Sequence, residues 1–358
     1  MIPPPFPCRP LILGVVLLGL LSLGACANPS VPGTTPDGAS VTTGEAAGSA
    51  VATPAPITLM LDYQPNTNHT GIYVAQAHGY FQAAGLAVTI IEPGEVYPEQ
   101  ALTTGVADFG ISFQEALTLA RAQGAPLVSL AAIIQHNSSA FAARGTLGVR
   151  SAADYAGRRY GGFGTPFEMP TLNALMACDA VARGMAQPPA AVEEINLGLS
   201  DPLALLAAEQ IDLAWIFEGW QGMQARRSGL QLDLVRLADH QDCIPDYYTP
   251  ILIGRQAMID ARPEVVRAFV AAVARGYADA IADPAVAAAE LLKAVPELDA
   301  GLVRESQAWL SPRYQDDAPR WGQQRPEVWQ GYADWLLAQA VLAAPLDTTL
   351  AFDNRFLP

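Results

Sequence analysis

The chain has 358 residues, of which 51% are hydrophobic and 15% are charged, and its formal net charge at pH 7 is −15. It is long and apolar enough to bury the cores of about two domains, which excludes a disordered chain. The acidic balance argues against a nucleic-acid-binding protein, because phosphate contacts need clustered lysine and arginine, and Lys293 is the single lysine.

The N-terminal segment has the pattern of an export signal. An apolar run over 11–23 follows Arg9 and ends in Gly24-Ala25-Cys26. This run is too short to span a bilayer, but it suits the core of a signal peptide. The small residues before Cys26 resemble a lipobox, so we predict a lipoprotein signal peptide over 1–25 and a diacylated Cys26; the alternative is an ordinary secretory signal with an incidental cysteine.

A tether is predicted after the signal peptide. Residues 26–56 are rich in Ala, Gly, Thr, Ser and Pro and contain almost no large apolar side chain. Such a segment cannot bury enough surface to offset the entropy of ordering, so we expect it to be flexible. The chain has no basic surface for membrane docking, so the lipid on Cys26 would anchor it to the outer side of the cell membrane.

Two cysteines remain in the mature chain after Cys8 leaves with the signal peptide and Cys26 is lipidated. Cys178 and Cys243 can form a disulfide outside the cytoplasm, or they can be two separate buried thiols. The sequence leaves both possibilities open. Neither cysteine has metal-site spacing, so we expect no metal and no other cofactor. The histidines are equally scattered, at His69, His78, His136 and His240.

The folded part begins with alternating strands and helices. Short apolar runs predict strands at 57–62, 86–91 and 108–112, separated by helices at 70–84 and 99–104. This alternation indicates an α/β fold with a mostly parallel sheet.

A second series of the same kind follows. It has predicted strands at 159–163, 192–197, 211–217 and 232–237 and a helix at 171–182. We therefore expect two α/β lobes with mostly parallel sheets that flank a ligand cleft and a hinge.

The late chain reads as consecutive helices that we expect to pack on the first lobe. The predicted helices are 263–282, 285–294, 301–310 and 327–342, and the predicted crossovers between the lobes lie near 138–146 and 248–254. The resulting domain map has 57–143 plus 252–358 as lobe 1 and 144–251 as lobe 2.

Several segments resemble one known family. They are 61–66 (LDYQPN), 105–110 (GVADFG), 162–166 (GFGTP), 215–220 (WIFEGW) and 245–250 (PDYYTP). Together with the chain end they are similar to the thiamine pyrimidine synthase-like periplasmic-binding family. The resemblance implies the type 2 periplasmic-binding fold and a substrate-binding protein that works with an ABC permease and its ATPase.

The resemblance and the strand pattern together predict a ligand site. Aromatic faces from two lobes can sandwich a flat heterocycle, and carboxylates can accept hydrogen bonds from its N–H groups. Core packing is the alternative for the aromatic residues, and a solvated surface is the alternative for the acids. The predicted ligand-binding residues are Asp62, Tyr63, His69, Glu168, Trp215, Glu218, Trp220 and Tyr248.

The ligand predicted is riboflavin, with a formylated or hydroxymethylated aminopyrimidine precursor of thiamine as the alternative. Pyrimidine-binding members of the family often have two adjacent acids after the glycine turn, whereas Met169 follows Glu168 here. A soft apolar side chain favours a neutral tricyclic ring over a cationic aminopyrimidine.

A synthase is the main rival function, because the family includes enzymes that make the thiamine pyrimidine. Those enzymes resemble this chain around 75–81, but His78 stands where they have the lysine that holds pyridoxal phosphate. The cysteine-rich stretch of the enzymes is reduced to Cys243. We therefore predict a protein that is not an enzyme. A sensory or adhesion lipoprotein with the same fold is a third possibility.

Overall fold

The structure is a computed structural model that describes residues 53–94, 96–198 and 200–358. The predicted signal peptide, Cys26 and nearly all of the predicted tether lie outside these residues. The first strand already begins at Ala55, inside the end of the predicted tether. None of the described helices is long and apolar enough to cross a membrane.

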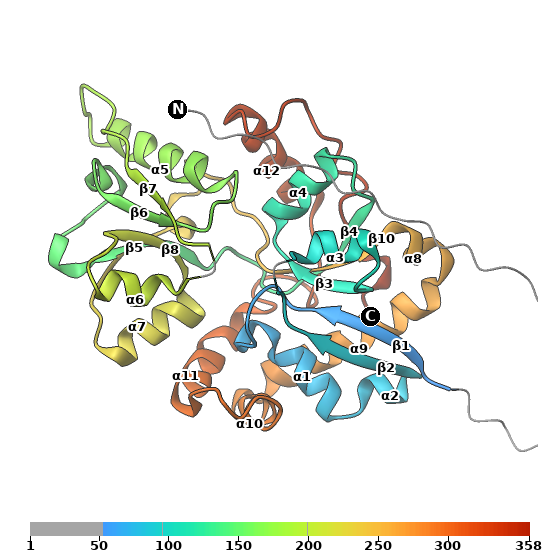
Figure 1. The fold of residues 1–358 in the computed structure, drawn as a ribbon. Helices are drawn as coiled ribbons and strands as arrows, with labels where there is room; N and C mark the ends of the chain where they lie inside the picture. The colour runs from blue at the N-terminus through green and yellow to red at the C-terminus, as the bar shows by residue number, and fades with distance from the viewer. Residues whose placement is uncertain (1–52, 95, 199) are drawn as a thin grey trace, which may run out of the picture. The chain divides into compact units, whose positions relative to one another are not determined.

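Two five-stranded sheets form the framework (Figure 1). The first has the order β2 (Leu86–Ile91), β1 (Ala55–Met60), β3 (Phe109–Ser112), β10 (Ile251–Arg255) and β4 (Leu127–Ala132). The second has the order β7 (Glu193–Asn196), β6 (Arg159–Gly162), β8 (Leu213–Phe217), β5 (Ser139–Arg144) and β9 (Leu232–Arg236).

One strand in each sheet runs against the others. β10 is antiparallel to β3 and β4, and β5 is antiparallel to β8 and β9. Each of these strands follows a crossover from the other sheet, so it enters at the carboxyl edge and must run backwards. The predicted α/β fold is confirmed, with mixed sheets in which the other strands run parallel. Because β5 lies in the second sheet, we propose to move the predicted lobe boundary at residue 143 to before Ser139.

The helices agree with the predicted ones where the apolar period is strong. The predicted helix over 70–84 is in fact two helices, because Gly79 takes a left-handed conformation with φ of 69° and ends the first. The helix bounds are α1 Thr70–Ala77, α2 Tyr80–Ala83, α3 Pro98–Thr104, α4 Gln114–Ala122, α5 Glu168–Ala182, α6 Pro202–Ala207, α7 Met223–Ser228, α8 Gln256–Ala261, α9 Pro263–Ala282, α10 Pro284–Ala294, α11 Ala300–Leu310 and α12 Pro326–Ala338.

The first core lies between the first sheet and helices α1 and α9. Phe269 of α9 stacks on Phe109 of β3, with ring centroids 4.0 Å apart. The two helices touch backbone to backbone, because a Cβ atom on Gly276 would lie only 1.8 Å from the carbonyl oxygen of Gly71. This close approach fixes α1, and with it the loop that follows β1.

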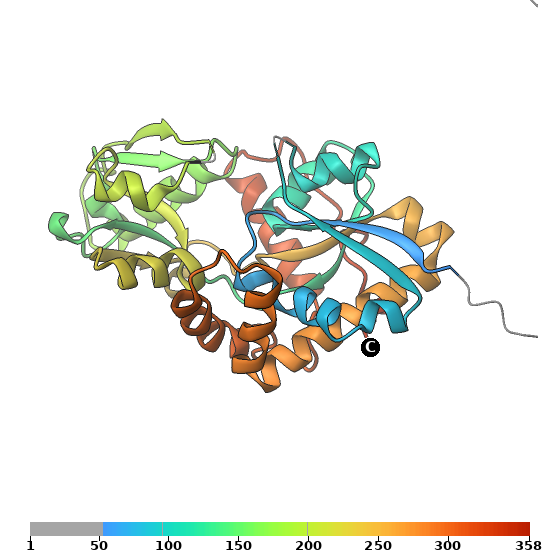
Figure 2. The same ribbon diagram turned by 60° about the horizontal axis from the view of Figure 1, so that its bottom comes forward.

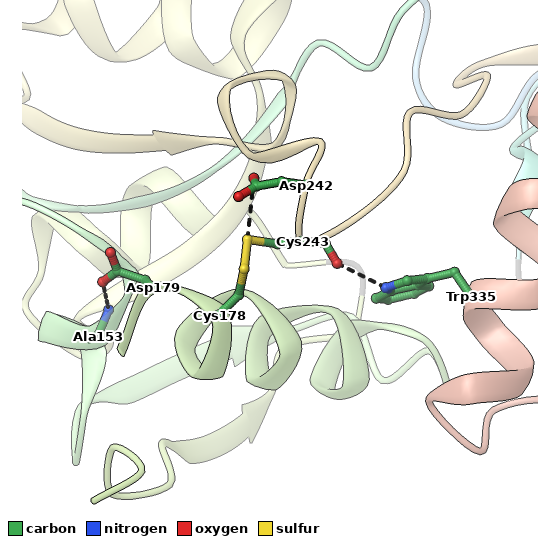
Figure 3. The surroundings of a disulfide bond; sticks show 6 residues. All are labelled: Ala153, Cys178, Asp179, Asp242, Cys243 and Trp335. Atoms are coloured by element: carbon green, nitrogen blue, oxygen red, sulfur yellow. Dashed lines mark hydrogen bonds between the residues drawn. A yellow bond between two sulfur atoms is a disulfide. The ribbon is translucent and has the colours of Figure 1, made fainter. Parts of the chain in front are cut away.

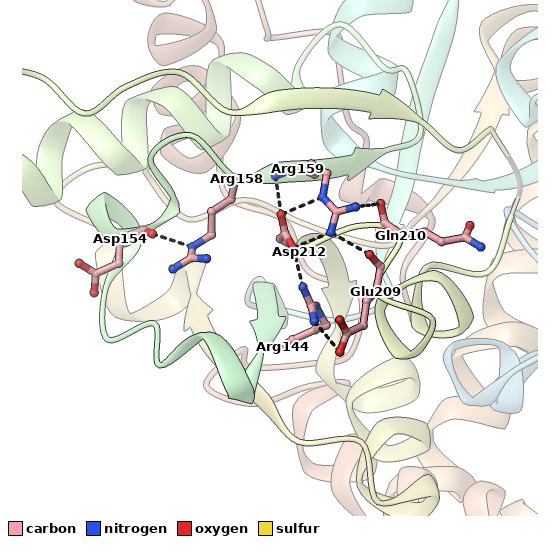
Figure 4. Close-up of polar contacts among 7 residues, drawn as sticks. All are labelled: Arg144, Asp154, Arg158, Arg159, Glu209, Gln210 and Asp212. Atoms are coloured by element: carbon pink, nitrogen blue, oxygen red, sulfur yellow. Dashed lines mark hydrogen bonds and ion pairs between the residues drawn. The ribbon is translucent and has the colours of Figure 1, made fainter.

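A charged cluster ties the amino-terminal ends of β6 and β8 to the end of β5 in the second lobe (Figure 4). The carboxylate of Asp212 accepts hydrogen bonds from the guanidinium groups of Arg144 (2.6 Å) and Arg159 (2.9 and 3.1 Å), and from the backbone N–H of Arg159 (3.0 Å). The arginines hold the pKa of Asp212 well below its usual range, chiefly through the side-chain hydrogen bonds from Arg159. The opposite, carboxyl edge of the sheet is left for the candidate site.

The late helices, which we expected on the first lobe, make contacts with both lobes. α10 and α11 lie beside each other, with α10 against α1, and α11 also contacts α7 of the second lobe (Figure 2). α12 packs on both cores, since Trp329 joins the first lobe and Tyr332 joins the second. We therefore propose that α12 bridges the two lobes instead of belonging to the first lobe alone.

A disulfide joins Cys178 of α5 to Cys243, with Cα atoms 5.8 Å apart (Figure 3). The sequence left open a disulfide or two separate thiols, and the structure has the disulfide. The backbone carbonyl of Cys243 accepts a hydrogen bond of 3.0 Å from the indole N–H of Trp335 in α12. The disulfide and this bond together fix the segment before the second crossover.

Candidate functional site

The carboxyl end of β1 presents Asp62 next to a fully buried histidine. Nε2 of His69 lies 2.6 Å from Oδ1 of Asp62, and Nδ1 of His69 accepts a hydrogen bond of 3.2 Å from the backbone N–H of Asn66. This pattern assigns a neutral ring that donates from Nε2 to Asp62. Because both ring nitrogens are engaged, His69 orients Asp62 and has no free donor for a ligand.

Tyr63 follows Asp62 and lies half-buried near the second lobe. Burial and then the negative charge of Asp201 raise the pKa of its phenol group. Asp201 caps α6 by accepting a hydrogen bond of 2.9 Å from the N–H of Leu203. Tyr63 is therefore an aromatic group of the first lobe that comes close to the loop after β7 in the second.

The carboxyl end of β8 presents Phe217 and Glu218. One oxygen of Glu218 accepts a hydrogen bond of 2.8 Å from Nε of Arg236, at the end of the neighbouring strand β9. This hydrogen bond is the main reason that the pKa of Arg236 is raised. Glu218 is thus an ion-paired carboxylate that keeps one oxygen for another donor.

Two phenylalanines that the sequence analysis missed form an aromatic pair between the lobes. Phe113 directly follows β3 of the first sheet, Phe217 is the last residue of β8 of the second, and both are half-buried. Their rings are within 14° of parallel, with centroids 6.1 Å apart. The signal was present in the sequence, because Phe113 follows β3 in the same way that Tyr63 follows β1.

Glu168 is a structural residue of the glycine turn. Its carboxylate is 1% exposed and accepts four hydrogen bonds, from the hydroxyl of Tyr160, the N–H of Phe163, and the N–H and hydroxyl of Thr165. These four donors leave little capacity for a ligand. Met169 packs against the second core. The presence of Met169 in place of a second acid, which favoured riboflavin in the sequence analysis, therefore concerns residues that pack inside the protein.

The remaining predicted aromatic residues pack within the protein. Trp215 is 5% exposed and lies against Phe141 of the second core. Tyr248 is 1% exposed, and its hydroxyl oxygen accepts a hydrogen bond of 2.9 Å from the N–H of Arg325. Trp220 belongs to the π-helical turn Glu218–Gly222 and packs against the cluster formed by α1, α10 and α11. The structure thus brings Asp62, Tyr63 and Glu218 to the carboxyl edges, whereas Trp215 and Tyr248 are buried and Trp220 is half-buried.

A pocket of about 560 Å³ lies elsewhere, at the outer edge of the first sheet. It is bounded by β2, α1 and α10, and it contains none of the predicted site residues. Two acids, Glu92 and Glu297, line it. The ligand cleft between the lobes therefore stays a prediction that rests on the paired edges.

Comparison with known proteins agrees with this fold. The chain is 28% identical to the riboflavin-binding protein RibY of Chloroflexus aurantiacus over 98% of both chains. It is 25% identical to the formylaminopyrimidine-binding protein of Halalkalibacterium halodurans, over 83% of this chain and 89% of that one. It is also 26% identical to the 4-amino-5-hydroxymethyl-2-methylpyrimidine phosphate synthase of Schizosaccharomyces pombe, over 70% and 72%.

Solved structures show the same fold at low sequence identity. The alkanesulfonate-binding protein SsuA of Xanthomonas axonopodis pv. citri superposes with a TM-score of 0.62 at 18% identity, over 84% of this chain and 99% of that one. This confirms the predicted periplasmic-binding fold. The profile of one family, described as NMT1/THI5 like, matches residues 66–287, which is more than half of the chain. The chain therefore belongs to the NMT1/THI5-like family.

Proposed function

We propose that this protein is the substrate-binding component of an ABC importer, anchored outside the cytoplasmic membrane through Cys26. It captures a flat heteroaromatic vitamin or vitamin precursor and delivers it to a permease and its ATPase. Riboflavin is the preferred ligand, and an aminopyrimidine precursor of thiamine is the alternative.

The observation that carries this proposal is the aromatic pair of Phe113 and Phe217. A lobe-closing protein that binds a planar molecule needs nearly parallel aromatic faces, one from each lobe. Phe113 and Phe217 supply two such faces, which stack on each other here and would have to part to admit a ligand between them. Glu218 directly follows Phe217, and Asp62 lies just beyond the carboxyl end of β1, the strand that pairs with β3. Their carboxylates suit the N–H groups at the edge of a nitrogen heterocycle.

The preference for riboflavin is supported by the similarity to RibY along 98% of both chains, compared with 83% and 89% for the formylaminopyrimidine-binding protein. The long tricyclic ring of riboflavin also offers more stacking surface than a single pyrimidine ring.

A binding role is favoured over synthase chemistry by the absence of a suitable amine. Nδ1 of His78, which replaces the expected lysine, lies 3.0 Å from Asp279 and 3.2 Å from the hydroxyl of Tyr80. Lys293, the single lysine of the chain, is exposed on α10 and paired with Glu290. A Schiff base with pyridoxal phosphate would need an amine at the site.

Ligand titration tests the proposal. The full chain in detergent is titrated with riboflavin, followed by flavin fluorescence, and separately with a formylated aminopyrimidine, followed by calorimetry. We expect riboflavin to bind with a Kd below about 1 μM and its fluorescence to be quenched by stacking.

Variants of Phe217 provide the matched comparison. Phe217→Ala should weaken binding at least tenfold, about 1.4 kcal/mol, whereas Phe217→Tyr keeps the ring and should stay within about threefold. Val181→Ala, on an exposed part of α5, serves as the surface control. Tight aminopyrimidine binding without flavin quenching would transfer the assignment to the thiamine precursor, and no binding of either compound would refute the proposed function.

A further inference from the structure

The pocket of about 560 Å³ at the outer edge of the first sheet has an open mouth and a buried floor. It lies between the edge strand β2, helix α1, and the end of α10 with the residues that follow it; we call it the edge pocket. Tyr73 and Val295 are buried at its floor, whereas Glu92 and Glu297 are exposed at its mouth. Small-molecule sites have volumes of about 300–1,000 Å³, so a ligand of that class fits and can enter without movement of the lobes.

Tyr73 of α1 places an unpaired hydroxyl group in the edge pocket. The residue is 8% exposed and belongs to the apolar cluster that includes Leu291 and Val303. Its hydroxyl group has no hydrogen-bond partner within the described part of the chain. Because nearly all buried polar groups in proteins are hydrogen-bonded, this hydroxyl points to a partner that the chain itself does not supply.

Two carboxylates lie close to the Tyr73 hydroxyl. Burial, and then the negative charges of Glu92 and Glu297, raise the pKa of this phenol group to about 12. The hydroxyl therefore keeps its proton at neutral pH, and its oxygen can accept a hydrogen bond. The edge pocket thus brings together three oxygen acceptors from α1, from the end of β2 and from the segment after α10.

The negative charge of the edge pocket is not compensated by the described residues. Neither Glu92 nor Glu297 forms an ion pair with them, and no lysine, arginine or histidine lines the pocket. Lys293, which precedes the lining residue Ala294, is 70% exposed and is itself paired with Glu290 at 2.6 Å. An anion would be repelled by the two carboxylates, so the charge of the pocket favours a cation.

The remaining lining residues suit the body of a small organic molecule. Pro65, Val88 and Ile90 contribute apolar surface. The side-chain N–H of Gln76 donates a long hydrogen bond of 3.5 Å to the carbonyl of Val88, which leaves the amide oxygen of Gln76 as a further acceptor. An alkyl chain can therefore pack beside the strand while a charged end group meets the acids.

A metal ion suits the edge pocket less well than an organic cation. Calcium takes six to eight oxygen ligands close to one another, and magnesium needs near-ideal octahedral geometry. Among the described residues, only Cys178, Asp242 and Cys243 form a group of three or more potential metal ligands within 4.8 Å of one another. An ammonium group has three N–H donors and needs only three acceptors.

We propose that the edge pocket is a second binding site, which takes a free alkyl amine as its ligand. The ammonium group donates to the carboxylates of Glu92 and Glu297 and to the Tyr73 hydroxyl oxygen, and the alkyl chain lies against the apolar lining. The site goes beyond the proposed function, because it shares no residue with the carboxyl edges of the two sheets. Its occupation would join α10 to α1 and β2.

Titration of the full chain in detergent with pentylamine tests the proposal, with ligand-detected NMR as the measurement. At pH 7 and about 150 mM NaCl, we expect saturable binding with a Kd below about 1 mM. Pentanol has the same chain without the charge, and tetramethylammonium has the charge without N–H donors, so each should bind at least tenfold more weakly than pentylamine.

Variants of the lining residues locate the bound amine. Glu92→Gln and Glu297→Gln should each weaken pentylamine binding at least fivefold, and both acids are exposed, so the variants should fold. Tyr73→Phe keeps the ring and should weaken binding about threefold. Glu264→Gln, an exposed acid in the first turn of α9 that does not line the pocket, is the matched control and should bind as the wild type does.

The outcomes are independent of the riboflavin titration. Phe217→Ala should leave pentylamine affinity within twofold of wild type, and a larger loss would place the amine in the cleft and overturn the proposal. No binding at about 10 mM pentylamine, equal binding of tetramethylammonium, or unchanged affinity in the Glu92→Gln/Glu297→Gln double variant would each show that the pocket holds only water and counterions. An Nα-acetyl-lysine amide that binds more than tenfold tighter than pentylamine would assign the pocket to a lysine of a partner protein and overturn the free amine.

Discussion

The ion cluster around Asp212 should be a main support of the second lobe. Replacing Asp212 by asparagine removes the charge and turns an amide N–H towards two guanidinium groups. The carboxylate accepts four hydrogen bonds, from Arg144 and Arg159, and its side chain is only 13% exposed. Hydrogen bonds to charged groups contribute about 1.5–3 kcal/mol, and loss of one partner from a buried ion pair about 3–5 kcal/mol.

The expected loss is smaller than the sum of these contributions. Arg159 is 35% exposed and can be rehydrated, and asparagine keeps one acceptor oxygen. We therefore expect Asp212→Asn to lower the free energy of unfolding by about 2–3 kcal/mol, equivalent to roughly 5 °C in Tm.

The effect should depend on pH in a defined direction. The pKa of Asp212 is lowered in the folded state, so the stability it contributes is present above the ordinary aspartate pKa of about 3.9 and is lost as pH falls through the lower folded value. The difference between wild type and Asp212→Asn should thus be constant from about pH 5 to 8 and shrink below about pH 4.

Urea unfolding followed by tryptophan fluorescence measures this difference. Trp215 lies in the core of the same lobe and reports on it if the lobes unfold separately. Asp239→Asn, at an exposed position of the same lobe, is the control. A difference below about 0.5 kcal/mol at pH 7, or one that grows in acid, would refute the reasoning.

Three further predictions concern other parts of the framework. Gly276→Ala should destabilise the first lobe by at least about 3 kcal/mol, because the added methyl group meets the Gly71 carbonyl; thermal unfolding measures it, and a Tm near wild type would contradict the close approach. Cys178→Ser should cost about 2–4 kcal/mol in urea unfolding, because the disulfide spans 65 residues, and an unchanged midpoint would count against the bridge. A hydrogen bond to Asp246 chiefly raises the pKa of His136 to about 9, so its contribution is complete below about pH 6.5 and is lost as pH rises through 9. Wild type should therefore lose more stability than His136→Gln between pH 7 and 9.5, and equal losses would dismiss this ion pair as a support of the crossovers.

The sequence by itself determined the two-lobed α/β organisation. Strand patterns depend on short-range alternation of apolar residues, and helix α9 has the same bounds in the prediction and in the structure because its apolar period is strong. Missed elements such as β4, β5 and β10 are short apolar runs that a local pattern cannot distinguish from other buried segments.

Only the tertiary structure decided which polar and aromatic side chains are available to a ligand. The sequence correctly predicted that Asp62 and Glu218 lie at strand ends, because the end of a strand is a local property. It did not reveal that Glu168 is saturated by its own turn or that Tyr248 is bonded to Arg325, 77 residues away in sequence. The partners of Glu168 lie within eight residues of it, and the conformation of the turn decides that they bond to it. The bond between Tyr248 and Arg325 depends on long-range packing, and the same packing joined Phe113 to Phe217 from two different sheets.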